Sequence, residues 1–479
     1  MLNNSEDQIT ALNNLEAFLH SKSNLMIITG KAGTGKTTLV RQIQEKAYEN
    51  NWKTISLGVW GRSVSSIIQL TGIPSLTIAK YNQIFEDLKK ENYQFKSFEE
   101  WYKSNYSIRF KSAPQRIIDG IKNVFDFRDE IQNKLLVIDE ASTLEFKTLD
   151  EAFKNTGNNT KVVLIGDSCQ LRAKNNPDSN LLDSSYWKQK ENESNFQLFS
   201  VSTNLETSHR VSEGPLFELA EKLRLLTNTN LEGDESRQII IDSVNTEEVI
   251  AVGKNLSLKI FEKVKEIKEA IFIAGKGEVD DINKSLREIY LSRFSGNQNK
   301  NFQTIEENEI IRSRCNGVFD AFMTGDEFII NKIHSRSDKF IFADVTCITR
   351  NKEFSKNIFV AFYQTLKNLF DSNQNLQSTV AIFTEPYLFD SEEIYWKHLK
   401  IQMHKAWESL VQKDIEFNLN KVDEVIGTTY GYAVTIEHAQ GGEWDTVALS
   451  LGVDGKIDIP RYWYTAVSRA KKLLYVLPS

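Results

Sequence analysis

The sequence has few of the residues that hold a fold together through covalent bonds or metal ions. Only three cysteines occur among the 479 residues, far apart in the chain (Cys169, Cys315 and Cys347). The composition therefore argues against a disulfide framework and against a cysteine-rich zinc site, and it fits a reducing compartment. The six histidines form no His-x-x-x-His pair, so we expect no structural transition metal.

Long hydrophobic runs are missing as well. No stretch approaches the roughly 18 uninterrupted apolar residues of a membrane-spanning helix, and residues 1–10 are polar and acidic, unlike a secretory signal. We therefore expect a cytoplasmic protein with no membrane partner, located in the host cytoplasm if a phage encodes it. The net charge of −7 excludes a protein that coats nucleic acid with a basic surface, but it allows a local basic groove.

Apolar runs of strand length alternate with helical patterns along much of the chain. Residues 24–29, 134–138 and 161–165 are continuous apolar runs, and residues 37–47 have a helical pattern. Such runs are typical of parallel strands covered by helices on both faces, which indicates the α/β class. After Arg210 the pattern restarts, with a helix expected at 281–291 and strands at 270–274, 432–435, 446–449 and 473–477. We predict two α/β domains, each with an insertion.

The two predicted insertions differ in character. Residues 81–130 contain 11 aromatic residues of 50, against 11% in the whole chain. These rings either form a small packed subdomain or meet a substrate. Residues 291–420 lose the alternation and predict short antiparallel strands at 326–333, 340–349 and 357–362, then a helix at 392–413. The other segments form the first domain (1–80 and 131–212) and the second domain (213–290 and 421–479).

A phosphate-binding loop follows the first predicted strand. Residues 30–37, Gly-Lys-Ala-Gly-Thr-Gly-Lys-Thr, fit the pattern G-x-x-x-x-G-K-[ST] between a strand and a helix. Glycines let backbone N–H groups surround phosphates, the helix N-terminus adds positive potential, and Lys36 neutralises the β- and γ-phosphate oxygens. The Thr37 hydroxyl can bind Mg²⁺. The expected nucleotide-binding residues here are Gly30, Ala32, Gly33, Thr34, Gly35, Lys36, Thr37 and Thr38.

An acidic pair and two arginines complete the expected ATP site. Asp139 and Glu140 end an apolar run, so they lie at the edge of a parallel sheet where ligands bind. We expect Asp139 to hold Mg²⁺ and Glu140 to activate the attacking water as general base. The planar guanidinium groups of Arg210 and Arg469 suit a phosphoryl group, although spacing alone favours a surface position for both.

Taken in order, these segments resemble those of superfamily 1 DNA helicases of the RecD/Dda-like subclass, most of all phage Dda helicases. The more specific pieces have the patterns Gly-Asp-x-x-Gln-Leu (166–171), Gln-Gly-x-Glu-Trp-Asp (440–445) and Val-Ser-Arg-Ala (467–470). With Gln8, the phosphate loop, Gly61-Arg62-Ser63, Arg210 and residues 432–435, they occur in family order from residue 8 to 470. The resemblance therefore covers nearly the whole chain.

The resemblance implies two RecA-like domains with ATP between them. Gln8 would contact adenine, Gln170 would sense the γ-phosphate, and Arg210 and Arg469 would approach that phosphate across the cleft. Thr435 and Glu443 would belong to the segment that links nucleotide to DNA, and Gly441 and Glu443 would bind the nucleotide. The insertion at 81–130 would be the strand-separating wedge, and the one at 291–420 an SH3-like subdomain. The implied DNA contacts are Trp60, Gly61, Arg62, Thr77, Thr435 and His438.

Members of this subclass move 5′→3′ on single-stranded DNA, so single-stranded and forked DNA are the implied partners, together with single-strand-binding or replisome proteins. Both arginines stand in one chain, so a monomer could suffice.

The usual Ala-Pro-Thr-Gly-Arg-Ala appears here as Gly58-Val59-Trp60-Gly61-Arg62-Ser63. Trp60 stands in place of a threonine that would bond a DNA phosphate, and it either stacks on a base or is packed.

Further departures from the family pattern lower the expected affinity for DNA more than they affect the expected ATP hydrolysis. The usual Pro-Pro after Leu171 is missing, and Glu437 and His438 replace the usual His and Lys. Some attraction for phosphate is thereby lost. We predict an ATP-dependent DNA helicase that uses ATP and Mg²⁺. The alternatives are a translocase that does not unwind, a nucleotide-gated DNA-binding module, and a small-molecule kinase, which would leave the segment 440–445 unexplained.

Overall fold

The structure is a computed structural model that describes residues 4–90, 115–127, 132–173, 180–190, 193–201, 203–207, 213–227, 233–244, 246–253, 270–294, 305–313, 325–336, 340–349, 353–362, 424–452 and 459–477. These residues form two parallel sheets and one closed barrel. None of the described helices is long and apolar enough to cross a bilayer. The chain divides into two compact units: Met1–Asn82 with Phe127–Gln298 and Tyr432–Ser479, and Gln83–Asp126 with Asn299–Gly431.

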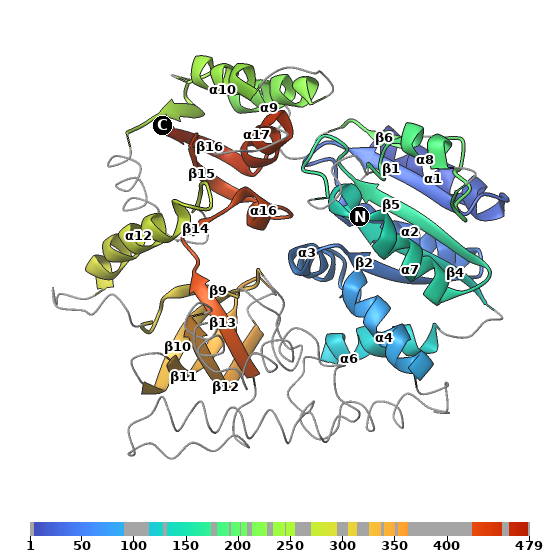
Figure 1. The fold of residues 1–479 in the computed structure, drawn as a ribbon, viewed down its shortest axis with the longest axis horizontal. Coiled ribbons are helices and arrows are strands. Elements are labelled where there is room, and N and C mark those ends of the chain that lie inside the picture. Colours follow the sequence, from blue (N-terminus) through green and yellow to red (C-terminus); the bar gives the residue numbers. More distant parts are fainter. Residues whose placement is uncertain are drawn as a thin grey trace. The chain divides into compact units, whose positions relative to one another are not determined.

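The first sheet has six parallel strands in the order β3-β2-β4-β5-β1-β6 (Figure 1). Residues 135–138 and 162–165, at the centres of two strands, are all buried. Because successive side chains of a strand point to opposite faces, helices or loops must cover both faces, as the apolar runs predicted. The strands are β1 (Leu25–Gly30), β2 (Trp52–Gly58), β3 (Leu76–Thr77), β4 (Asn133–Asp139), β5 (Thr160–Gly166) and β6 (Thr203–Leu205).

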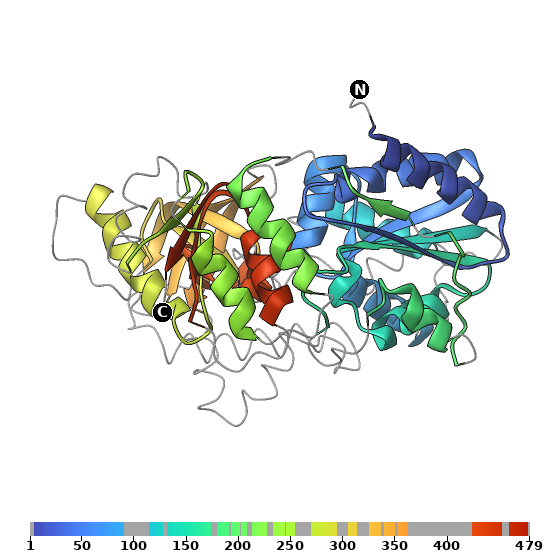
Figure 2. The ribbon, with the colours of Figure 1, turned by 90° about the horizontal axis from the view of Figure 1, so that it is seen from above.

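Helices cover this sheet on its two faces. Apolar residues of α1 (Glu6–His20), α2 (Lys36–Glu49) and α3 (Gly61–Thr71) share one core with the strands. Figure 2 shows α1 (dark blue) on one side of the strands and α7 (Phe146–Thr156) and α8 (Ser184–Lys190), in green shades, on the other. Rings of Phe146, Trp187 and Phe196 pack together on that second side.

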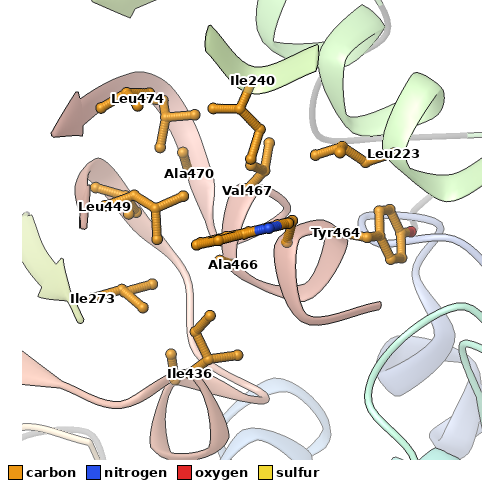
Figure 3. Packing of buried hydrophobic residues seen from close by; sticks show 14 of the residues in the cluster. Leu223, Ile240, Ile273, Ile436, Leu449, Tyr464, Ala466, Val467, Ala470 and Leu474 are labelled. Atoms are coloured by element: carbon orange, nitrogen blue, oxygen red, sulfur yellow. The ribbon is translucent and has the colours of Figure 1, made fainter. Parts of the chain in front are cut away.

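The second sheet has five parallel strands in the order β14-β8-β15-β16-β7. They are β7 (Val249–Ala251), β8 (Ala270–Ile273), β14 (Ala433–Val434), β15 (Trp444–Ser450) and β16 (Ala470–Leu477). The helices of this region are α9 (Pro215–Leu226), α10 (Gly233–Asp242), α12 (Val279–Phe294), α16 (Ile436–Ala439) and α17 (Ile459–Val467). Figure 3 shows their core, where Leu223 and Ile240 from two helices meet Leu474 of β16 around Val467. Both sheets therefore confirm the predicted α/β class.

A closed five-stranded barrel has the order β10-β11-β12-β13-β9. Its strands are β9 (Ile310–Ser313), β10 (Glu327–Arg336), β11 (Phe340–Cys347), β12 (Glu353–Phe362) and β13 (Glu424–Tyr430). β10, β11 and β12 occur where the sequence predicts antiparallel strands. However, β13 lies beyond the expected end at residue 420, because it closes the barrel by pairing with β9 and with β12. The helix predicted at 392–413 lies outside the described residues.

The aromatic-rich segment 81–130 is described only at its two ends. These ends are helical, in α4 (Ile78–Lys90) and α6 (Gln115–Asp126). Four of its eleven aromatic residues are described, and all four are buried (Tyr81, Phe85, Phe125 and Phe127). For these four rings the packed interpretation therefore holds. The other seven lie in the part of the chain that the structure does not describe.

Candidate nucleotide and DNA site

The turn from β1 into α2 builds the predicted phosphate loop. Gly33 and Gly35 have φ of 81° and 76°, a left-handed conformation that favours glycine. A Cβ on Gly30 would lie 2.8 Å from Leu205 Cβ and from Thr34 Oγ1, so this position also requires glycine. The Lys36 ammonium group donates to the carbonyl oxygens of Gly30 and Lys31, both at 2.7 Å. Its charge is thereby held against the loop.

The remaining loop residues have local roles that the sequence does not predict. The Thr34 hydroxyl donates to the carbonyl oxygen of Lys31 at 2.9 Å and so closes the turn. Ala32 and Thr38 are half-buried, one in the loop and one in the first turn of α2. The Gln8 carboxamide donates to the Thr34 carbonyl at 3.1 Å and accepts the N–H of Ser5 at 3.2 Å, which caps α1. Gln8 thus adjoins the loop, and its contact with adenine stays a prediction.

Thr37 and Asp139 meet although 102 residues separate them. The Thr37 hydroxyl donates to Asp139 Oδ2 at 2.8 Å, and the backbone N–H of Glu140 donates to Asp139 Oδ1 at 2.9 Å. Burial, with the neighbouring charge of Glu140, raises the pKa of Asp139 to about 6. One hydroxyl and one carboxylate beside a phosphate loop are the oxygen donors with which proteins hold Mg²⁺ next to phosphate oxygens and water. The donor set therefore fits Mg²⁺.

Two buried side-chain oxygens of predicted site residues have no hydrogen-bond partner. They belong to Glu140 (Oε2) and Gln170 (Oε1). Buried acceptors are nearly always satisfied in folded proteins, so these two atoms are available to a bound group such as a water. Glu140 also has a left-handed backbone, with φ of 57°, which is uncommon for a residue with a side chain and clusters at functional sites. Glu140 is the residue predicted to activate the attacking water, and Gln170 is the one to which the family resemblance gives γ-phosphate sensing.

Arg469 is not a surface residue. It is 3% exposed and donates to the carbonyl oxygen of Thr465 at 2.9 Å, to Ser468 Oγ at 2.9 Å and to the carbonyl oxygen of Gly442 at 3.3 Å. Burial lowers its pKa, and the charge of Glu140 opposes that shift. The charge of Glu140 therefore acts on the guanidinium group of Arg469. Arg210, its expected companion, lies outside the described residues.

Helix α17 carries polar side chains whose contacts the sequence does not predict. Tyr464 donates its hydroxyl proton to Asp167 Oδ2 at 2.7 Å and accepts the N–H of Ala32 at 3.5 Å. Thr465 Oγ1 accepts the N–H of Leu171 at 3.1 Å. The sequence signal is a set of polar side chains, Arg461, Tyr464 and Thr465, in a largely apolar helix.

A pocket adjoins the phosphate loop within the first unit. Lys31 of the loop pairs with Glu221 of α9 at 3.2 Å, and its ammonium group lies 5.1 Å from the centre of the Phe217 ring. The pocket is lined by Lys31, Ala32, Leu216, Phe217, Ala220, Glu221, Tyr464, Val467, Ser468 and Ala470. The pocket is thus lined by the phosphate loop of the first sheet and by helices and a strand of the second sheet.

Among the predicted DNA contacts, Trp60 is the most accessible. It is 50% exposed, and its indole N–H donates to Thr143 Oγ1 at 2.7 Å, which fixes the ring. Gly61 begins α3 directly after it. Thr77 is half-buried, and its hydroxyl oxygen accepts the N–H of Lys80 at the start of α4. A fixed, half-exposed indole suits base stacking. Thr77, in contrast, caps the N-terminus of α4.

Arg62 occupies a different environment from the one expected. It is 9% exposed, its guanidinium carbon lies 4.6 Å from the centre of the Trp444 ring, and Nη1 donates to the carbonyl oxygen of His438 at 3.5 Å. A Cβ on Gly442 would lie 2.7 Å from the guanidinium carbon, so Gly442 makes room for it. Arg62 therefore packs on the segment 438–444 rather than facing solvent.

The remaining predicted residues lie at the turn around α16. Thr435 precedes this helix, and its hydroxyl lies 3.1 Å from His438 Nδ1. Gly441 has φ of 71°, a left-handed conformation, and its carbonyl oxygen accepts the Ser66 hydroxyl at 3.4 Å. Glu443 is exposed. This turn thus contacts α3 of the first sheet next to Arg62.

Comparisons with known proteins match two segments of the chain to known families. A family model described as an AAA domain matches residues 4–179, and one described as a UvrD-like helicase C-terminal domain matches residues 430–477. The RecBCD enzyme subunit RecD of Buchnera aphidicola subsp. Schizaphis graminum is 26% identical over 153 residues, 31% of this chain. The chain spans about a quarter of that relative's length, 23%.

Solved structures show a similar fold at low sequence identity. A Pif1 helicase from Candida albicans has a TM-score of 0.53 and 14% identity, with 100% of this chain and 95% of that chain covered. A Pif1 helicase from Bacteroides in complex with ADP-AlF3 and ssDNA has a TM-score of 0.50 and 15% identity, with 100% and 93% covered. The chain therefore contains segments that match an AAA domain and a UvrD-like helicase C-terminal domain, and its fold with two parallel sheets is similar to that of these Pif1 helicases.

Proposed function

We propose that the chain is an ATP-dependent DNA helicase that moves 5′→3′ on single-stranded DNA and unwinds duplex. The observation that carries the proposal is the meeting of four separated segments at one site. The phosphate loop, the pair Asp139–Glu140, residues 167–171 and helix α17 are joined there by the bonds Thr37–Asp139 and Tyr464–Asp167. The site is complete only when residues from both sheets meet. A motor driven by ATP requires such a site, because closure around the nucleotide can then be coupled to hydrolysis.

Each residue has a chemical task in this proposal. Lys36 would neutralise the β- and γ-phosphates, while Thr37 and Asp139 would hold Mg²⁺. Glu140 would accept a proton from the water whose oxygen attacks the γ-phosphorus, as the bond from that phosphorus to the bridging oxygen breaks. Arg469 would stabilise the charge that develops on the γ-phosphate oxygens. Gly441 and Glu443 would contact the nucleotide, and Glu443 with Thr435 would connect the nucleotide site with the DNA site.

The DNA path is proposed from side chains next to this site. Trp60 would stack on a base, and Gly61, Thr77, Thr435 and His438 would line the backbone path beside it. Stacking tolerates every base, so little sequence preference is expected. Single-stranded and forked DNA are the proposed partners, together with single-strand-binding or replisome proteins. Lys36, Glu140 and Arg469 stand in one chain and one unit, which supports action as a monomer.

The test is ATP-dependent opening of two matched duplexes, one with a 5′ single-stranded tail and one with a 3′ tail. ATP hydrolysis is recorded in the same samples, and Lys36→Ala is the control that should lose both activities. Opening of the 5′-tailed duplex alone is the expected result. Opening of the 3′-tailed duplex alone would overturn the polarity and keep the motor.

One observation favours a second candidate, a translocase without robust unwinding. Arg62, a predicted DNA contact, is packed on Trp444. The predicted backbone path therefore offers less positive charge to hold the strand. Strong DNA-stimulated hydrolysis without opening of either duplex would select the translocase, whereas binding without hydrolysis would select a nucleotide-gated binding module.

A further inference from the structure

Helix α17 holds the segment 167–171 through three polar side chains on one side of the helix. Arg461 donates to the carbonyl oxygen of Ser168, and Thr465 Oγ1 accepts the N–H of Leu171. Tyr464 donates to Asp167. Spacings of three and four residues place these side chains on one helix face. The segment that contains Gln170 is thus fixed at three points by the helix that leads to Arg469.

Tyr464 differs from the other two because its hydroxyl has a contact on each side. The oxygen accepts the N–H of Ala32 in the phosphate loop and gives its single proton to Asp167 Oδ2. Both Tyr464 and Asp167 are 1% exposed, so water does not compete for these bonds. A phosphate oxygen in the loop would attract the same Ala32 N–H. The strength of the Tyr464–Asp167 bond therefore depends on what the loop holds.

Asp167, which Tyr464 holds in place, also contacts Gln170. Its Oδ1 accepts the N–H of Cys169 at 3.0 Å, and its Oδ2 accepts Gln170 Nε2 at 3.5 Å. With Nε2 directed to Asp167, the carboxamide oxygen of Gln170 faces away, and it is the buried atom that has no partner. The orientation of the Gln170 side chain is therefore set by Asp167, whose other oxygen contacts are with Tyr464 and the backbone.

We propose that Tyr464 is a positioning residue for ATP turnover: its hydroxyl ties the phosphate loop to Asp167 and so sets the orientation of the Gln170 carboxamide. The inference rests on the proposed function and deepens it. It requires that Tyr464 act on the rate of the chemical step through Gln170 and not on the affinity for ATP. The two quantities can be measured separately.

The test compares Tyr464→Phe, which removes only the hydroxyl, with Tyr462→Phe, the same change at another buried tyrosine of the same helix. Wild type must first show DNA-stimulated hydrolysis; without it the proposed function fails and the role of Tyr464 has no basis. In Tyr464→Phe we expect kcat for DNA-stimulated hydrolysis to fall by about ten-fold, the effect of losing one hydrogen bond to a charged group. KM for ATP should stay near that of Tyr462→Phe.

The route through Gln170 is tested by adding Tyr464→Phe to Gln170→Ala. If Tyr464 acts through Gln170, the double variant has the kcat of Gln170→Ala alone, whereas independent effects multiply. Asp167→Asn serves as a second variant should Tyr464→Phe not fold, and it should show the same loss of kcat. A kcat for Tyr464→Phe equal to that of Tyr462→Phe, or a further ten-fold drop in the Gln170→Ala background, would overturn the assignment.

Discussion

Replacing Asp139 with asparagine tests whether a buried carboxylate is kept at this site at a cost in stability. Asp139 is 1% exposed, and burial with the charge of Glu140 raises its pKa from 3.8 to about 6. One pKa unit corresponds to about 1.4 kcal/mol, so ionisation of Asp139 lowers the free energy of unfolding by up to about 3 kcal/mol. Asparagine is neutral and nearly the same size, so it removes this term without leaving a cavity.

The hydrogen bonds at the site tolerate this change. Asparagine Oδ1 can accept the N–H of Glu140 as Asp139 does now, and its amide nitrogen can donate to the Thr37 hydroxyl, whose oxygen also accepts. Because the pKa of Asp139 is raised in the folded state, its destabilising contribution is absent below about pH 3.8, where the carboxyl is protonated in both states. This contribution grows as the pH rises toward 6. The advantage of Asp139→Asn should therefore grow across this window and stay constant above it.

The assay is thermal unfolding followed by circular dichroism at pH 4, 6 and 8, in EDTA and without nucleotide. Asp281→Asn is the control, since the side chain of Asp281 is 79% exposed. We expect a higher midpoint for Asp139→Asn at pH 8 and almost no difference at pH 4. In a separate hydrolysis assay with Mg-ATP, the variant should show no turnover. A variant that is less stable at pH 8, or equally more stable at all three pH values, would refute the reasoning.

Three further substitutions test other parts of the site. Arg469→Ala should lower kcat by about 10³-fold, as expected for an arginine that meets the transferred phosphate, with ATP affinity retained in a fluorescence titration; normal turnover would contradict this role. Arg62→Gln should leave the salt dependence of single-stranded DNA binding unchanged, because the guanidinium group packs on Trp444, whereas a phosphate contact would reduce the slope by about 0.7. Trp60→Ala should weaken single-stranded DNA binding by about 1–3 kcal/mol, with Trp60→Phe retaining most of the affinity; equal binding by wild type and Trp60→Ala would mean that the exposed ring does not stack.

Local sequence patterns were enough to predict the parts of the site that are local in the fold. The phosphate loop lies between β1 and α2, and Asp139 ends β4, because glycines, apolar runs and helix starts act over a few residues. The parallel pairing of β1 with β5, and of β4 with β5, then brings the ends of these strands to one edge of the sheet. The predicted meeting of Thr37 and Asp139 follows from that topology.

The unpredicted contacts join residues that are far apart in the chain. Tyr464 and Asp167 are 297 residues apart, and Arg62 lies 376 residues from His438. The local sequence around a tyrosine or an arginine does not indicate such a distant partner. The contact depends on how the regions around the two sheets pack against each other. Likewise, β13 joins the barrel by pairing with β9 and with β12, two strands that precede it by more than 60 residues in the chain.

The burial of helix α17 has a consequence for how the protein tolerates mutation. Every residue from Pro460 to Val467 is buried. Trp463 and Val467 belong to the apolar core of the second sheet, while Thr465 contacts the backbone of Leu171. A helix at a protein surface usually has one side where substitutions are neutral, and α17 has none. Random drift should therefore leave this helix nearly unchanged, and a library of variants should show it as a continuous block of intolerant positions.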